Sequence, residues 1–149
     1  MICGYAAPAN GRAAGYGPYR VSQMFSNPVA SYAAINSVCV QNNADILKSY
    51  KSLNNTLLKC GPNFFTKHFY YLGKSQGLKL YPLIFDDRVA AGLVKILLPL
   101  PIPSRLFNMV NAMAKRTPEA YINYLEYVWN EARLIGCNPD QIEHYLFTL

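Results

Sequence analysis

The chain has 149 residues, of which 52% are hydrophobic and 15% are charged, so it is long enough for one globular domain and too apolar for general disorder. A total of 14 lysines and arginines against 8 aspartates and glutamates gives a net charge of +6, which favours a polyanionic partner or an anionic surface but does not bear on the fold. The sequence contains no P-loop, Gly-x-Gly-x-x-Gly, Gly-x-Ser-x-Gly or EF-hand pattern, which leaves nucleotide-binding, serine-hydrolase and calcium-binding functions without a motif.

Residues 1–25 are rich in glycine, alanine and proline, and they contain no apolar run long and uninterrupted enough for a signal peptide. This composition predicts an irregular N-terminal arm. The remainder, residues 26–149, is predicted to form a single helical domain.

The first helix of that domain is predicted to begin at Asn27, because an asparagine followed by proline is typical of a capping residue and a first helical position. We expect it to run to about Val40. A second helix is predicted from Asp45 to Cys60, because apolar residues recur there at helical spacing.

Lys67 is the first residue with a candidate chemical role. It lies in an aromatic helix predicted over residues 62–73, directly after the Gly61-Pro62 break, and most of its aromatic neighbours are predicted to pack in the core. A lysine in this setting has two interpretations. Its aliphatic stem covers aromatic surface while the ammonium stays in water, or its amine reacts with a substrate in a cleft.

Asp86 is the second such residue. It follows the apolar run 81–85, which is predicted to be an extended linker because the chain offers no partner strand, and it opens a helix that runs to Leu98. A carboxylate at this position caps the helix and faces the positive end of its dipole. The alternative is that Asp86 points into the same cleft as Lys67, which lies nineteen residues earlier in the chain.

The C-terminal part is predicted to continue as helices. The apolar run 93–103 is too short and too interrupted by proline to span a bilayer. Further helices are predicted from Ser104, from Thr117 to Ile135, and from Asn138 onward.

The four cysteines, Cys3, Cys39, Cys60 and Cys137, form no Cys-x-x-Cys pair and no Cys/His cluster with zinc-ligand spacing. We therefore expect free thiols in a reducing cytoplasm, with no metal centre and no cofactor.

The segments GPNFFTKHFYYLG and LYPLIFDDRVAAGL resemble the bacterial 8-oxoguanine DNA glycosylase-like proteins of the helix-hairpin-helix superfamily. The C-terminal GCNPDQIEHYLF is similar to the Gly-x-x-Pro-Asp-x-x-Glu-x-x-Leu-Phe pattern with which that family ends. The resemblance covers residues 56–149 well and the first 40 residues poorly. It implies an all-α fold, a single compact domain of about six or seven helices built on a helix-hairpin-helix core.

The resemblance also implies a function: a DNA repair glycosylase or AP lyase that excises a damaged base, with 8-oxoguanine as a candidate, from duplex DNA. Lys67 matches the family's nucleophilic lysine, which attacks the sugar C1′ of a flipped nucleotide. Asp86 matches the aspartate that stabilises the developing sugar cation. Such a protein has no membrane partner and resides in the cytoplasm, at the nucleoid in a bacterium.

The hairpin of this family binds phosphate through backbone N–H groups at a helix N-terminus. Pro62 removes one of these donors, which nearby side chains are expected to replace. The predicted DNA contacts are Gly61, Asn63, Thr66 and Arg88. Tyr70 and Tyr71 are the candidates for stacking on an extruded base.

The hairpin departs from the family's usual pattern, which is Gly-x-Gly with the lysine two residues after the second glycine. Here Pro62 follows Gly61, and Lys67 lies one helical turn later. The departure supports an alternative of a different class, a non-catalytic DNA-binding or protein-interaction helical module that has lost the glycosylase chemistry.

Overall fold

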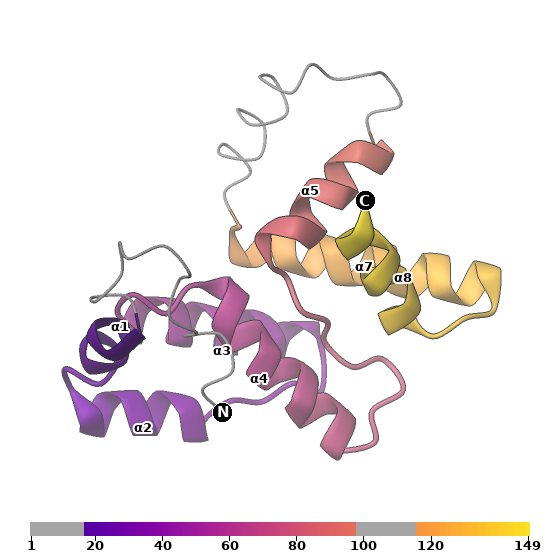
Figure 1. Ribbon diagram of the computed structural model, residues 1–149. Helices are drawn as coiled ribbons and strands as arrows, with labels where there is room; N and C mark the ends of the chain where they lie inside the picture. Colours follow the sequence, from indigo (N-terminus) through magenta and orange to yellow (C-terminus); the bar gives the residue numbers. More distant parts are fainter. Residues whose placement is uncertain (1–16, 98–115) are drawn as a thin grey trace.

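The computed structural model describes residues 17–97 and 116–149, and every regular element in these two ranges is an α-helix (Figure 1). In chain order the helices are α1 (Gly17–Met24), α2 (Pro28–Asn36), α3 (Asn43–Thr56), α4 (Pro62–Ser75), α5 (Asp87–Leu97), α7 (Pro118–Ile135) and α8 (Pro139–Thr148). Helices α1 to α4 form one side of the molecule, and α5, α7 and α8 form the other (Figure 1). This architecture confirms the predicted all-α domain, while the helix predicted from Ser104 begins outside the described residues.

Local sequence signals set several helix ends, as predicted. The Asn27 side chain accepts a hydrogen bond from the Ala30 amide at 3.2 Å, and the Thr117 hydroxyl accepts one from the Ala120 amide at 3.1 Å. Each cap is followed by a proline at the first helical position. Helix α7 ends at Gly136, whose φ of 77° lies in the left-handed region that glycine adopts without strain.

Three predicted boundaries are corrected by the structure. Gly17–Met24 forms α1, although the composition of residues 1–25 predicts an irregular arm; residues 1–16 lie outside the described part of the chain. Helix α2 ends at Asn36 and not at residue 40, and α3 ends at Thr56 and not at Cys60. A hydroxyl group in α3 explains the early end of α2, because Ser49 bonds both the amide and the carbonyl of Cys39 at 2.9 Å and draws that backbone out of the helix.

The core joins three helices through aromatic rings. Tyr50 on α3, Phe69 on α4 and Tyr121 on α7 are fully buried, and the ring of Tyr121 lies 5.3 Å from that of Tyr50 and 6.3 Å from that of Phe69. Phe85, from the chain between α4 and α5, adds a stacked ring 5.9 Å from Tyr121. The aromatic residues of the predicted helix over 62–73 therefore pack largely as expected, with Phe65 and Phe69 buried.

Residues 81–86 cross this core without helical structure and, within the described residues, without a partner strand. The predicted linker therefore needs other partners for its buried backbone groups. Side chains of α7 provide them: Tyr121, Tyr124 and Trp129 donate hydrogen bonds of 2.7, 3.2 and 3.1 Å to the carbonyl oxygens of Leu83, Ile84 and Tyr81, respectively. The packing of α7 thus determines the course of the segment that leads to Asp86.

A glycine lets this segment approach α4. A Cβ atom at Gly73 would lie 2.8 Å from Pro82 Cδ and 2.9 Å from Tyr81 Cβ, closer than side-chain atoms pack. Gly73 is itself buried. The close contact between α4 and the segment therefore depends on the absence of a side chain at this position.

Replacing Tyr121 by phenylalanine should lower the free energy of unfolding by about 1–3 kcal/mol, because the buried carbonyl of Leu83 would lose its hydrogen bond and gain no water. Urea unfolding followed by circular dichroism measures the change. The matched control is Tyr71→Phe, because the Tyr71 side chain is 56% exposed and its hydroxyl remains in water. Equal stability of the two variants would contradict the proposed role of the α7 hydroxyl groups.

In the same described ranges, Cys39, Cys60 and Cys137 form no disulfide, and no group of histidine, cysteine, aspartate and glutamate side chains is arranged to bind a metal ion. The search for helices that are both long and apolar enough to cross a bilayer found none among residues 17–97 and 116–149.

Candidate active site

The chain between α3 and α4 forms a tight hairpin. Lys59 has a φ of 60°, in the left-handed region, and Gly61 is the extended N-cap residue of α4 with a φ of −79° and a ψ of 176°. Among the described residues, no side chain caps this helix N-terminus, and a Cβ atom placed on Gly61 would meet no atom within 4 Å. The N-terminus of α4 is therefore open to a ligand on the side that Gly61 faces.

A cavity of about 460 Å³ lies at this hairpin. Its polar lining comes from Asn54, Lys59, Asn63, Asp87 and Arg116. The Asp87 carboxylate accepts a hydrogen bond from Asn63 Nδ2 at 3.0 Å and pairs with Arg116 Nη2 at 2.9 Å. Asn63 Oδ1 and Arg116 Nη1 are buried without a hydrogen-bond partner within the part of the chain that the structure describes. Two residues of the cavity lining thus each carry a buried polar atom without a partner in this range, an acceptor on Asn63 and a donor on Arg116.

Lys67 lies on the face of α4 that is turned toward the N-termini of α5 and α8. Asn63, Lys67, Tyr70 and Lys74 follow one another at intervals of four, three and four residues, which places them along one side of the helix. The contacts at both ends of this row show its direction: Asn63 bonds Asp87 at the start of α5, and Lys74 bonds an aspartate of α8. The Lys67 side chain is half-buried, and no ion pair joins it to a carboxylate in the described ranges.

Asp86 is the N-cap of α5. Its Oδ1 accepts hydrogen bonds from the amides of Arg88 at 2.9 Å and Val89 at 3.0 Å, so the capping interpretation is confirmed. Capping also fixes the orientation of the carboxylate at the positive end of the helix dipole. The structural role and a role in binding a developing positive charge are therefore compatible.

One hydrogen bond joins the residues that precede Lys67 and Asp86 in the chain. The hydroxyl of Thr66 accepts a hydrogen bond from the amide of Phe85 at 3.1 Å and donates one to the carbonyl of Pro62 at 2.6 Å. Lys67 and Asp86 each come directly after one member of the Thr66–Phe85 pair. Because Thr66 is fully buried and uses its hydroxyl in both bonds, contact with a phosphate would require it to give these bonds up.

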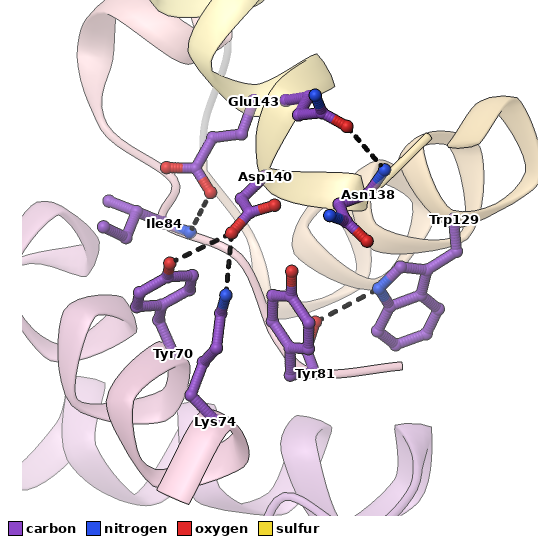
Figure 2. Close-up of polar contacts among 9 residues, drawn as sticks. Tyr70, Lys74, Tyr81, Ile84, Trp129, Asn138, Asp140 and Glu143 are labelled. Carbon is purple, nitrogen blue, oxygen red and sulfur yellow. Dashed lines mark hydrogen bonds and ion pairs between the residues drawn. The ribbon is translucent and has the colours of Figure 1, made fainter. Parts of the chain in front are cut away.

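The N-terminus of α8 closes the other end of the α4 face (Figure 2). Asp140 Oδ2 pairs with Lys74 Nζ at 2.8 Å and accepts a hydrogen bond from the Tyr70 hydroxyl at 3.3 Å. The Lys74 ammonium also lies 4.5 Å from the ring centroid of Tyr81. The hydrogen bond to Asp140 raises the pKa of Lys74, and bonds to Lys74 hold the pKa of Asp140 below its usual value in spite of partial burial.

Glu143, also on α8, is a site residue that the sequence analysis did not identify. Its Oε2 accepts a hydrogen bond from the amide of Ile84 at 3.1 Å (Figure 2). Burial raises the pKa of Glu143 to about 7, and the nearby carboxylates of Asp86 and Asp140 contribute to the increase. The only sequence signal was the position of Glu143 in the C-terminal GCNPDQIEHYLF pattern, which carried no indication that its side chain reaches residue 84.

The remaining predicted site residues differ in accessibility. Arg88 is exposed, and its guanidinium lies 5.0 Å from the ring centroid of Phe147. Tyr70 is held by its bond to Asp140 and by edge contacts with the rings of Tyr71 and Tyr81. The ring of Tyr71 is 56% exposed, so of the two stacking candidates it is the one that is open to a ligand.

A family model described as "Putative 8-oxoguanine DNA glycosylase OGG-like protein" matches residues 4–147, nearly the whole chain. No curated protein and no solved structure matches.

Proposed function

Because the chain belongs to the family of 8-oxoguanine DNA glycosylase OGG-like proteins, we propose that it excises a damaged base from duplex DNA, with Lys67 as the nucleophile and Asp86 as its partner. The observation that supports this proposal is the hydrogen bond between Thr66 and Phe85, the residues that directly precede Lys67 and Asp86 in the chain. 8-Oxoguanine is the first lesion to test. A DNA substrate would place the protein in the cytoplasm, at the nucleoid in a bacterium.

In the proposed reaction the neutral amine of Lys67 attacks C1′ of a nucleotide that has been flipped out of the duplex. The N-glycosidic bond breaks, and positive charge develops at C1′ and the ring oxygen. The base leaves with the bonding electron pair and takes up the proton that the amine loses as it bonds to C1′. The carboxylate of Asp86 stabilises that charge. Opening of the sugar ring then gives a Schiff base between Lys67 and C1′, which hydrolysis releases or β-elimination converts into a strand break.

The hairpin is the proposed contact to the DNA backbone. The open N-terminus of α4 attracts a phosphate, and Arg116, which lines the adjoining cavity, adds a positive charge beside it. Asn63 lines the same cavity, and Arg88 lies exposed at the start of α5. The net charge of +6 would favour the approach of duplex DNA.

Replacing Gly61 by alanine should weaken binding to duplex DNA roughly tenfold, which corresponds to about 1.4 kcal/mol, and leave the stability of the free protein unchanged. The φ and ψ angles of Gly61 are allowed for alanine, and the new methyl group would meet no protein atom, only a phosphate that approaches the helix N-terminus. Fluorescence anisotropy with a labelled duplex at two salt concentrations measures the loss. Unchanged affinity would place the phosphate contact elsewhere.

The departure from the family's hairpin pattern supports a second candidate function, a DNA-binding module without chemistry. Pro62 occupies the first position of α4, and Lys67 lies one helical turn beyond the usual position of the lysine. Such a module would bind duplex DNA with a strong dependence on salt and release no base.

Borohydride trapping distinguishes the two functions. The protein is incubated with duplexes that carry 8-oxoguanine, uracil or an abasic site, and borohydride reduces any Schiff base to a stable adduct. An adduct with one lesion supports the glycosylase and identifies the lesion class. DNA binding without an adduct and without base release supports the module.

A further inference from the structure

Glu143 differs from the other side chains that bind the backbone of residues 81–86. Tyr121, Tyr124 and Trp129 of α7 are neutral donors to carbonyl groups, and Thr66 of α4 is a neutral acceptor. Glu143 accepts from the Ile84 amide with a carboxyl group, which carries a charge only in its ionised form. Among these hydrogen bonds to the backbone of residues 81–86, the bond to Glu143 is therefore the one whose strength changes when its acceptor takes up a proton.

Glu143 also lies close to Asp86. Ile84 is two residues before Asp86, and the two carboxylates repel one another, as do those of Glu143 and Asp140 on the same helix. The other ionisable groups around Glu143 are Lys74 on α4, whose ammonium favours the ionised form, and Tyr121 and Tyr124 on α7, whose hydroxyl groups are kept neutral by burial. Among the described residues, two carboxylates thus disfavour the ionised form of Glu143, and the Lys74 ammonium offsets them in part.

We propose that Glu143 is a positioning residue for Asp86: through the Ile84 amide its carboxyl group fixes the end of the segment that presents Asp86, and its ionisation adds negative charge beside that residue. The ionised form makes the stronger bond to Ile84 and would increase the stabilisation of a cation at Asp86. This inference rests on the proposed role of Asp86. It adds a second carboxyl group, from a distant part of the chain, to the site.

The direct test needs no DNA. The amides of Arg88 and Val89 donate to Asp86 Oδ1, so their NMR chemical shifts report on the Asp86 carboxylate, while the Ile84 amide reports on Glu143. In the wild-type protein all three amides should show a common inflection near pH 7. In Glu143→Gln, whose amide oxygen still accepts from Ile84, the common inflection should disappear from all three.

Two further variants make this titration specific. His144→Gln removes the neighbouring titratable side chain on α8 and should keep the inflection. Asp140→Asn removes a carboxylate that raises the pKa of Glu143, so the inflection should move to lower pH. An Ile84 inflection without a response at Arg88 and Val89, or an inflection that persists in Glu143→Gln, would overturn the proposal.

Stability gives an independent readout. The pKa of Glu143 in the folded protein lies above its value in the unfolded chain, so the native state binds an extra proton between the two values. The stability that the raised pKa of Glu143 provides is therefore complete below about pH 4.3, and it is lost as the pH rises to about 7. The folded-to-unfolded ratio should fall by roughly 10²-fold more across this range in the wild type than in Glu143→Gln. An identical decline in both proteins would contradict the raised pKa of Glu143 in the folded protein.

The catalytic consequence is measured with the trapping assay. The ratio of adduct formation at pH 8 to that at pH 6 should be several-fold smaller in Glu143→Gln than in the wild type, because only the wild type gains the second negative charge in this range. An equal ratio would overturn the link between Glu143 and the reaction. If no adduct forms with any protein, the proposed glycosylase fails, whereas the amide titration still decides whether Glu143 positions Asp86.

Discussion

Replacing Lys67 by alanine should reduce the borohydride-trapped DNA adduct by at least roughly 10³-fold, to the background of a reaction without protein. The variant lacks the amine that forms the Schiff base, and no other step of the proposed reaction can supply a covalent bond to C1′. Since Lys67 is half-buried on the surface of α4 and makes no ion pair in the described ranges, the substitution should not disturb the fold. Gel electrophoresis of the trapped complex measures the loss, and circular dichroism checks the fold.

Lys74 provides the matched control. It lies on the same face of α4, two turns beyond Lys67, but it is engaged by Asp140 and by the ring of Tyr81. Lys74→Ala should therefore still form the adduct, within the several-fold change expected from the loss of its ammonium near Glu143. An adduct that survives in Lys67→Ala would move the nucleophile to another amine and would refute the assignment of Lys67.

The role of Asp86 can be separated from its capping function. Asp86→Asn keeps a side-chain oxygen that accepts from the Arg88 and Val89 amides, so α5 should begin at the same residue. The negative charge is lost, and base release should slow by roughly 10²- to 10³-fold. A variant that is folded and fully active would show that Asp86 acts only as a helix cap.

Replacing Gly92 by alanine should destabilise the protein by at least about 3 kcal/mol. A Cβ atom at this position would overlap the carbonyl oxygen of Leu146 and lie 2.8 Å from the carbonyl carbon, and both belong to the backbone of α8. Leu146 lies in the last turn of α8 with its side chain fully buried, so its backbone cannot move aside as the end of a flexible side chain can. The clash should outweigh the gain of about 1 kcal/mol that alanine brings to a helix interior.

The consequence of Gly92→Ala extends to the site, because α8 carries Asp140 and Glu143. A displaced α8 would weaken the bond from the Ile84 amide to Glu143 and the pair between Lys74 and Asp140. Urea unfolding measures the stability, with Gly61→Ala as the control, since the same chemical change there meets open space. Equal stability of the two variants would mean that α5 and α8 pack less closely than the structure shows.

Features that depend on neighbours within one helical turn follow from the sequence alone. Asn27 and Thr117 cap helices because their side chains reach amides three residues on, and Gly136 ends α7 because glycine adopts the left-handed conformation. Asp86 was identified as a helix start for the same reason, and the apolar spacing within each helix indicated an all-α fold. Composition was a weaker guide, since it predicted a loop where Gly17–Met24 forms α1.

Only the tertiary structure determined which of these local features meet. The hydrogen bond between Thr66 and Phe85, the reach of Glu143 to the Ile84 amide and the pairing of Arg116 with Asp87 join residues far apart in the chain. No periodicity or capping rule encodes such pairs, because they depend on how close two helices pack. Here the distance between α5 and α8 depends on Gly92, because a side chain at this position would meet the backbone of α8. The residues next to Gly92 in the sequence give no sign of this contact.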